Sequence, residues 1–420
     1  MSSLASARTL YLCYFGLREP LVQTQVLPYL RQLAAQGLEV YLLTFEPQFS
    51  RAWSAAQLAE TRTRLAADGI HWHARAYHKR PSAPATLYDI LMGAVTALWL
   101  ARRHRIHVLH ARAHMALAMA LLARPLADTR VIFDVRGLMA DEYADAGHWR
   151  PDSAVYRAVK WLESLGLRRA DQLVVLTRRM RDWVVAEGYA SAEKIEVIPC
   201  CVDSARFAAQ NGTEDSATTT TPERFELIYA GAVTGLYLLD EIGQFFLAVR
   251  ARRADAFLRI LTKSDPAAAT ATLRRAGLRD EDFWIGPVAP AEVPQYLRRA
   301  RLGLSLRKPT FAQIASSPTK IPEYLLAGLP VVSNAGIGDT DELLERERVG
   351  VVLRSFDEQA LASAAAQALA LAADPALRAR CIQVARQQFD LVNVGGVGYG
   401  NVYRRIRKQQ TPALATHGAP

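Results

Sequence analysis

The residues from Ser317 to Glu323, SPTKIPE, combine the types best suited to hold a phosphorylated ligand. Ser317 is a candidate helix cap and Pro318 fits a first helical position. The free N–H groups and partial positive charge at such a helix start bind phosphate. Lys320 in the first turn is unfavourable unless an anion lies beside it, and Glu323 could accept hydrogen bonds from ribose hydroxyls. A capped helix with solvated Lys and Glu is the simpler alternative.

Alternating strand and helix patterns surround this stretch. Residues 9–15 predict a buried strand, 26–35 a helix with apolar residues at helical spacing, and 39–45 a second strand. Strand, helix and strand in this order indicate a parallel sheet. The alternation continues to residue 198, begins again at residue 226 and ends with Ala-rich helices. We therefore predict two tandem α/β domains with doubly wound parallel sheets, whose ligands bind at strand carboxyl ends in a cleft between them.

The expected divisions follow from these patterns. A first domain covers residues 1–200 and a second covers 201–379, with a polar, flexible segment at about 208–224. A helix in residues 380–420 is expected to return to the first domain.

Composition narrows the function classes. The 420 residues carry 51 Lys and Arg against 41 Asp and Glu, a net charge of +10. Residues 1–200 hold 25 basic and 18 acidic groups, and residues 201–420 hold 26 and 23, so the excess favours the first half. No nucleic-acid-binding motif accompanies it, which points to a phosphorylated substrate, an anionic membrane or an ordinary Arg-rich surface. Four cysteines, nine scattered histidines and the unpartnered HWH at 71–73 predict neither disulfides nor a metal site.

The N-terminus lacks the apolar core of a secretory signal, and the longest apolar run, 90–101, is too short to span a bilayer. A soluble intracellular protein is expected. The predicted helix 88–102 is apolar and lies between HKR at 78–80 and RRHR at 102–105. It could contact a membrane surface, although a core helix of the first domain is the favoured interpretation because apolar runs of about 10–14 residues are usually core.

The segment SPTKIPEYLLAGLPVVSNAGIGD, residues 317–339, resembles the nucleotide-sugar signature of glycosyltransferase family 4, which comprises retaining enzymes of the GT-B fold. Residues 20–46 are similar to the first unit of a bacterial exopolysaccharide subset of that family. Four more segments match in the expected order: 133–149, 198–207, 229–242 and 258–265. The resemblance implies two Rossmann-like domains facing across a cleft. It also implies metal-independent sugar transfer from a nucleotide diphosphate to a glycan or polyprenyl-linked glycan, in the cytoplasm or at the inner face of the cell membrane.

The resemblance also implies a donor site, with two departures. Ala315 stands where the family has the first of two Glu residues, the one that contacts the donor sugar. The loop 231–237 lacks the Arg and Lys that grip the diphosphate in the broader family, so Lys263 is a candidate substitute beside Lys320. The expected donor-binding residues are Lys263, Ser317, Thr319, Lys320 and Glu323. The resemblance, and nothing else in the sequence, makes UDP the expected nucleotide of the donor.

Catalytic and acceptor candidates lie in the first domain. Asp134 stands near the family's catalytic His or Asp, Arg136 could hold an acceptor phosphate, and Asp141 or Glu142 could position the acceptor hydroxyl. Each could instead form an ordinary salt bridge. The acceptor-binding candidates are Gly16, Gln23, His110 and Arg112, although His110 is more simply a hydrogen bonder at a strand end.

Two other functions stay open. A GT-B nucleotide-sugar epimerase would use the same cleft, although the Glu missing at position 315 weighs against it. A binding subunit that has lost activity is consistent with both departures from the family pattern.

Overall fold

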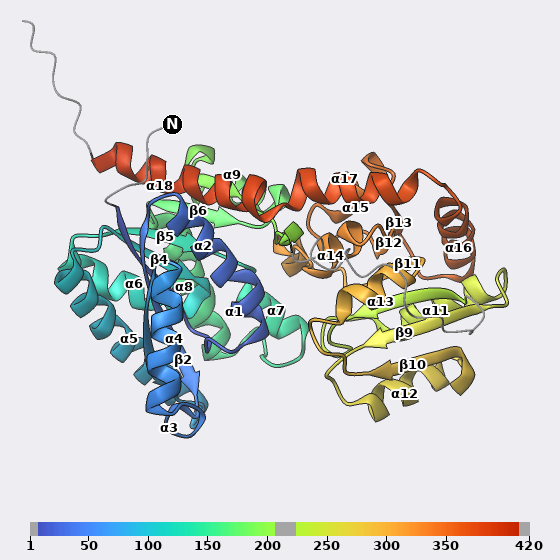
Figure 1. The fold of residues 1–420 in the computed structure, drawn as a ribbon, viewed down its shortest axis with the longest axis horizontal. Helices are drawn as coiled ribbons and strands as arrows, with labels where there is room; N and C mark the ends of the chain where they lie inside the picture. Colours follow the sequence, from blue (N-terminus) through green and yellow to red (C-terminus); the bar gives the residue numbers. More distant parts are fainter. Residues whose placement is uncertain (1–6, 206–223, 411–420) are drawn as a thin grey trace, which may run out of the picture.

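A computed structural model describes residues 7–205 and 224–410 and contains two parallel β-sheets side by side (Figure 1). The predicted flexible segment 208–224 lies, apart from its last residue, outside the described residues. Both sheets are doubly wound, as the alternating pattern predicted.

The first domain holds a seven-stranded sheet in the order β3-β2-β1-β4-β5-β6-β7. All of its neighbouring strands are parallel. The strands are β1 (Arg8–Cys13), β2 (Glu39–Pro47), β3 (Ile70–Tyr77), β4 (Val108–Arg112), β5 (Arg130–Asp134), β6 (Gln172–Val175) and β7 (Ile195–Val197). The helices are α1 (Pro20–Gln25), α2 (Leu27–Ala35), α3 (Phe49–Ala52), α4 (Ala55–Ala67), α5 (Ser82–His104), α6 (Ala113–Ala127), α7 (Met139–Asp145), α8 (Ala154–Arg169), α9 (Arg178–Ala186) and the short η1 (Ala192–Lys194).

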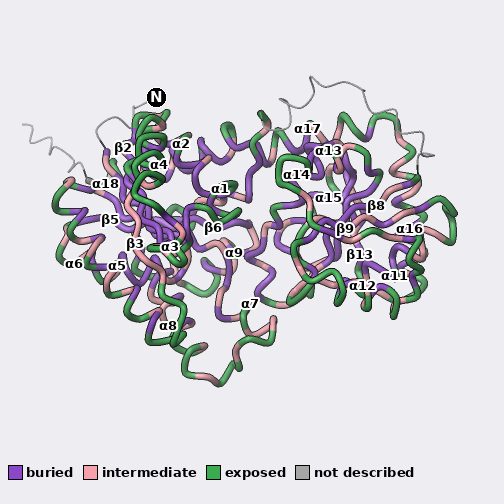
Figure 2. The backbone as a smooth tube through the Cα atoms, turned by 60° about the horizontal axis from the view of Figure 1, so that its bottom comes forward, coloured by how far each residue is buried: buried purple, intermediate pink, exposed green. Residues whose placement is uncertain are grey.

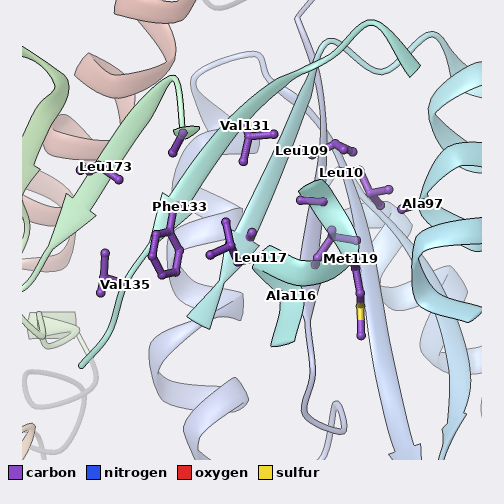
Figure 3. Packing of buried hydrophobic residues seen from close by; sticks show 14 of the residues in the cluster. Leu10, Ala97, Leu109, Ala116, Leu117, Met119, Val131, Phe133, Val135 and Leu173 are labelled. Atoms are coloured by element: carbon purple, nitrogen blue, oxygen red, sulfur yellow. The ribbon is translucent and has the colours of Figure 1, made fainter. Parts of the chain in front are cut away.

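Apolar strands buried on both faces hold this domain together. On one face α5, α6 and α8 pack on the sheet through small and apolar residues such as Ala97 and Leu117, which meet Leu10 and Phe133 (Figure 3). On the other face α2, α4 and α18 (Val397–Gln410) pack on it. Figure 2 shows the buried strands and the exposed outer faces of the helices.

The second domain holds a six-stranded sheet in the order β10-β9-β8-β11-β12-β13. Its strands, again parallel, are β8 (Phe225–Ala230), β9 (Ala256–Leu261), β10 (Phe283–Gly286), β11 (Leu302–Ser305), β12 (Val331–Asn334) and β13 (Gly350–Leu353). The helices are α11 (Leu239–Arg250), α12 (Pro266–Arg275), η2 (Asp280–Asp282), α13 (Val293–Arg299), η3 (Phe311–Ala315), α14 (Lys320–Leu326), α15 (Thr340–Arg346), α16 (Glu358–Ala372) and α17 (Leu377–Phe389).

The chain crosses between the domains twice, and the two crossings pair. Val202 and Asp390 form a parallel β-bridge, and the Asp390 carboxylate accepts the hydroxyl of Ser204 at 2.7 Å. Helix α17 belongs to the core of the second domain, so the return to the first domain starts at Asp390 rather than at residue 380. After a short turn of π-helix, η4 (Leu391–Gly396), helix α18 lies on the first sheet (Figure 1).

Among the helices of the described residues, α5 alone has the length and the apolar composition that would allow one helix to cross a membrane. Helices α16 and α17 pass the same test only as a pair bent by 96°. One third of the most apolar window of α5 is buried within the protein. Its inward residues, among them Ala97 and Leu100, are part of the first core, so α5 is a packed helix of the domain.

Candidate active site

The segment at 317–323 lies where the domains meet but is built differently from the expectation. Helix α14 begins at Lys320 after Thr319, so Ser317 does not cap it and Pro318 is not its first residue. The Ser317 hydroxyl instead accepts a hydrogen bond from the backbone N–H of Cys200, at 3.1 Å, at the first crossing. Helix α14 is only seven residues long. A helix this short offers little through its own N-terminus, so the surrounding side chains are the candidates for holding a phosphate.

Lys320 supplies the first of these side chains. Its Nζ is buried without a hydrogen-bond partner among the described residues. It lies 3.8 Å from the ring centre of Tyr229 and 4.6 Å from that of Tyr237, so cation–π contacts are its main compensation. Burial, and secondly the charge of Arg307, hold the pKa of Lys320 well below its usual value. A buried ammonium with unused donors is a ready partner for an anion.

Arg307 supplies the second cation and was missed by the sequence analysis. It follows β11, and its backbone exchanges two hydrogen bonds of 2.9 Å with the Asn334 side chain. Its guanidinium donates to Ser316 Oγ at 2.9 Å and lies 5.2 Å from the centre of the Tyr237 ring. Its buried Nε has no partner in the described structure. The available signal was its place directly after a strand of the second domain.

The loop after β8 leaves room for these cations. Gly231 has a φ of +142°, a backbone conformation that favours glycine, and a Cβ there would lie 3.1 Å from Lys320 Nζ. The loop lacks Arg and Lys, as the sequence showed, and the structure places Lys320 and Arg307 beside it instead. The pair forms a compact cationic site at the carboxyl edge of the second sheet.

The other donor candidates are spread around this pair. Lys263 is exposed just past the end of β9, the neighbouring strand. Thr319 is exposed at the start of α14, and Glu323 is half-buried one turn further and acts on Lys320 electrostatically. Their contact with a donor stays a prediction.

Glu142 faces the cationic pair from the first domain. Burial raises the pKa of its carboxyl, and Arg307 across the cleft opposes that rise. The carboxylate lies against Gly137, where a Cβ would come within 2.7 Å of Oε1, and Gly137 has a φ of +155°. Arg136 and Gly137, both with positive φ, therefore leave the space beside the backbone that the Glu142 carboxylate occupies.

Asp141, beside it in sequence, is engaged elsewhere. It accepts hydrogen bonds from Lys160 Nζ at 2.8 Å and from the Tyr156 hydroxyl at 2.7 Å. Lys160 also bonds Glu163 at 2.7 Å, and Glu163 bonds the His114 ring at 3.0 Å. These contacts connect α7 to α8. Asp141 therefore forms the ordinary salt bridge that was the alternative to a role in acceptor binding.

The remaining charged candidates gather in one buried cluster under α18. Asp134 lies 3.6 Å from Arg112, 3.7 Å from Arg136 and 3.8 Å from His110, and it accepts the Tyr399 hydroxyl at 2.9 Å. Burial alone would raise the pKa of Asp134, but the neighbouring Arg136, His110 and Arg112 lower it to about 2. The cluster joins the four candidates beneath α18. His110, Arg112 and Asp134 are alternate residues of β4 and β5 on the face that this helix covers, and Arg136 follows β5.

His110 and the two candidates near β1 have structural contacts of their own. The His110 ring bonds the Tyr403 hydroxyl at 2.8 Å, the strand-end role given as its alternative. Gln23 donates to the Leu17 carbonyl at 2.6 Å and braces the loop after β1. Gly16 is buried in that loop, where a Cβ would lie 2.8 Å from Pro47. Acceptor binding by these residues stays a prediction.

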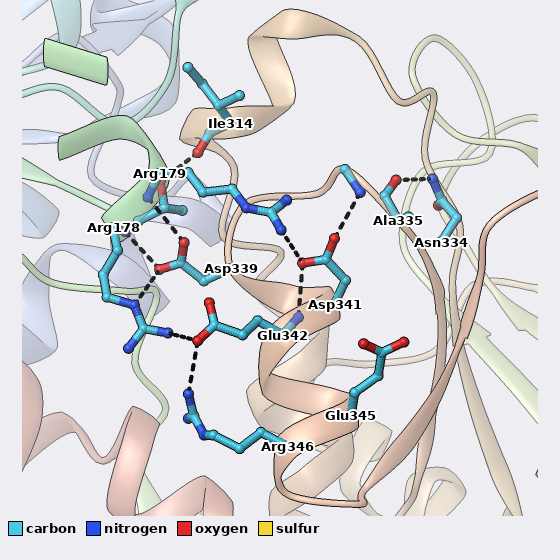
Figure 4. Close-up of polar contacts among 12 residues, drawn as sticks. Arg178, Arg179, Ile314, Asn334, Ala335, Asp339, Asp341, Glu342, Glu345 and Arg346 are labelled. Atoms are coloured by element: carbon cyan, nitrogen blue, oxygen red, sulfur yellow. Dashed lines mark hydrogen bonds and ion pairs between the residues drawn. The ribbon is translucent and has the colours of Figure 1, made fainter. Parts of the chain in front are cut away.

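A clamp of ion pairs fixes the two lobes against each other at one side of the cleft (Figure 4). The backbone N–H groups of Arg178 and Arg179, at the start of α9, donate to Asp339 of the second domain at 2.7 and 3.2 Å. The Arg179 side chain adds a 2.7 Å bond to Asp341, and Arg178 a 3.3 Å ion pair with Glu342. The carboxylate of Asp339 therefore caps a helix of the opposite domain.

Within the described residues no group of three or more His, Cys, Asp or Glu side chains is arranged to hold a metal ion. The chemistry that these residues can supply by themselves is cationic binding of a diphosphate on one lobe and a carboxylate on the other.

Comparison with known proteins identifies the family of the two domains. The glycosyl transferase 4-like domain model matches residues 22–201, and the glycosyl transferases group 1 model matches residues 226–371. No curated protein sequence matches the chain.

Among solved structures, a glycosyltransferase from Rickettsia africae superposes with a TM-score of 0.69 at 13% identity, covering 96% of this chain and 99% of its own. The Anabaena protein Alr3699/HepE, solved with UDP and glucose, gives 0.62 at 14% identity over 96% and 98% of the two chains. A putative UDP-N-acetylglucosamine 2-epimerase from Listeria monocytogenes gives 0.60 at 12% identity over 97% and 98%. The chain is therefore a glycosyltransferase of the GT-B fold, built from a glycosyl transferase 4-like domain and a group 1 domain.

Proposed function

We propose that this enzyme is a retaining glycosyltransferase that moves a sugar from a UDP-sugar to a glycan or lipid-linked glycan during cell-surface polysaccharide synthesis. The observation that carries the proposal is the buried Nζ of Lys320, which has no hydrogen-bond partner in the described part of the chain and lies beside Arg307. The choice of UDP is supported by the Anabaena protein, which was solved with UDP and glucose. The sugar transfer would take place in the cytoplasm, at the inner face of the cell membrane.

The two lobes would divide the chemistry. Lys320 and Arg307 bind the diphosphate and neutralise the charge that forms on it when the bond between the sugar and the phosphate oxygen breaks. The acceptor hydroxyl oxygen forms the new bond to the same sugar carbon. Glu142 holds that hydroxyl and receives its proton, a role for which a raised pKa is suited. Because two side-chain cations neutralise the leaving group, the proposal requires no metal ion.

Titration calorimetry with UDP, GDP and ADP tests the donor half of this proposal. UDP should bind the wild-type chain, and Lys320→Ala or Arg307→Ala should weaken its binding at least about tenfold, the minimum for a lost bond to a charged group. Arg299→Ala, an exposed cation of the same domain, is the matched control and should leave the affinity unchanged. A wild-type chain that binds none of the three nucleotides would falsify the assignment.

A nucleotide-sugar epimerase is the second candidate, and one feature favours it. Glu142 is a carboxylate with a raised pKa in the cleft, the kind of group that acid–base chemistry on a sugar ring requires. The putative Listeria epimerase shares the fold. Conversion of a UDP-sugar in the absence of any acceptor would favour the epimerase, and donor binding with neither turnover nor hydrolysis would indicate a binding subunit.

A further inference from the structure

Helix α5 leaves a stripe of large apolar side chains uncovered. Leu87, Tyr88, Leu91, Val95 and Trp99 are between 49% and 58% exposed. Their spacing places them along one side of the helix. At a rise of 1.5 Å per residue, the stripe is about 18 Å long. The opposite side of α5 is packed in the core, so the exposed stripe is a feature of a well-ordered helix.

Neighbouring helices extend this surface. Helix α6 packs between α5 and α8. It exposes Leu122 and Leu126 by 51% and 60%, and α8 exposes Val155 and Trp161 by 41% and 66%. Of the seventeen large hydrophobic side chains that are exposed in the described chain, nine lie on these three helices. Such a concentration on one face indicates an interaction surface.

The charges around the stripe are all of one sign. Between residues 82 and 101 the only charged side chain is Asp89, which is buried against Tyr14 and His78. Exposed cations stand at both ends of the helix: Lys79, Arg80, Arg102, Arg103 and Arg105. The α5 stripe carries no exposed acid and has cations at both helix ends, which matches the surface of a bilayer with anionic headgroups.

A second copy of the chain fits this surface poorly. If two α5 helices packed together in parallel, each end would meet its own cations. If they packed antiparallel, Lys79 and Arg80 would face Arg102 and Arg103. Either arrangement brings the like charges of the two α5 helices together, which disfavours association. An anionic lipid surface complements the same charges.

We propose that the α5–α6 face docks on an anionic bilayer, with the apolar stripe in the headgroup region and the terminal cations on lipid phosphates. Tyr88 and Trp99 have the amphipathic rings typical of such interfaces. Figures 1 and 2 place α5 and α6 at the end of the molecule away from the second domain, which leaves that domain free to bind a donor.

Docking here would deliver a lipid-linked acceptor to the cleft, a consequence that rests on the proposed function. The start of α5 lies at the carboxyl edge of the first sheet, because Asp89 accepts the hydroxyl of Tyr14, the residue after β1, at 2.8 Å. The docking itself does not depend on which sugar is transferred.

Flotation of the full chain with vesicles tests the proposal. Vesicles of phosphatidylcholine with phosphatidylglycerol should carry the wild-type chain, and vesicles of phosphatidylcholine alone should carry far less. Leu91→Glu/Val95→Glu should abolish binding to both. Arg103→Gln/Arg105→Gln should lower the affinity for the anionic vesicles about fivefold per charge.

Matched variants and a second readout make the outcome decisive. Val185→Glu/Trp284→Glu, at exposed apolar positions outside this face, and Arg252→Gln/Arg299→Gln should bind vesicles as the wild type does. Titration of each variant with UDP shows whether the variant is folded and binds the donor nucleotide, independently of vesicle binding. Wild-type chain that binds UDP but stays off anionic vesicles overturns the docking proposal, as does equal loss in the control variants. A dimer that Leu91→Glu/Val95→Glu dissociates, without vesicle binding, would assign the face to a second copy and also overturn it.

Discussion

Replacing Lys320 by Met separates the stability of the enzyme from its ligand binding, because the two should move in opposite directions. Met keeps the length of the side chain and removes a buried ammonium that finds no hydrogen-bond partner within residues 7–205 and 224–410. An unsatisfied buried polar group costs about 1–3 kcal/mol, and the lost cation–π contacts with Tyr229 and Tyr237 offset part of that. We expect the ligand-free variant to be as stable as the wild type or more stable by up to about 2 kcal/mol.

The same substitution should weaken UDP binding. A hydrogen bond to a charged group contributes about 1.5–3 kcal/mol, which corresponds to an increase in Kd of about 10- to 150-fold. Thermal unfolding with and without UDP measures both effects on one sample. Saturating UDP should raise the melting temperature of the wild type far more than that of the variant. Lys194→Met, at an exposed lysine of the first domain, should change neither quantity.

The depressed pKa of Lys320 adds a pH signature with a defined sign. Because the folded-state pKa lies below the unfolded value of 10.5, the unfolded chain binds more protons between the two. The stability of the ligand-free wild type should therefore rise with pH across that window, and the rise should be smaller in Lys320→Met. A phosphate beside the amine favours its protonated form, so UDP binding should take up protons when it is measured in buffers of different ionisation enthalpy. A variant that is destabilised and binds UDP like the wild type would refute the reasoning.

Four further perturbations test other parts of the molecule. Glu142→Gln should lower sugar transfer by about 10²- to 10⁴-fold in a radiolabelled-donor assay while the Kd for UDP stays unchanged; an equal loss of both would contradict its place on the acceptor side. Tyr399→Phe should destabilise the chain by about 1–3 kcal/mol in urea unfolding, because it removes a donor from buried Asp134. The stability that Asp134 provides should be lost as the pH falls from 3.8 to about 2, a loss absent in Asp134→Asn. Asp339→Ala should release the start of α9 and enlarge the radius of gyration in solution scattering; an unchanged profile would show that the clamp does not hold the lobes.

Much of the fold followed from local pattern. Buried apolar strands alternating with helices of 3.6-residue period predict parallel sheets, because both signals depend on near neighbours in the chain. The resemblance at residues 317–339 placed the nucleotide-sugar site in the second domain. Glu142 was among the candidates because it follows a strand end, a position that ligand sites in such sheets favour.

The details that tertiary contacts decide were beyond this reasoning. Ser317 stands in a sequence typical of a helix cap, but its hydroxyl accepts a hydrogen bond from the N–H of Cys200, which is far away in the chain. Arg307 has no motif around it and becomes part of the site because β11 ends beside the loop after β8. Both depend on partners that only the folded chain brings together.

The sequence alone therefore determined the two α/β domains, their order and the chemical class of the ligand, since periodicity and short motifs encode these. Only the tertiary structure decided which charged residues face the cleft. Asp134 and His110 are buried under α18, a helix that returns from the second domain and bonds both of them. The physical reason is that the direction of a strand residue is set by what packs on each face of the sheet, and that packing comes from distant segments.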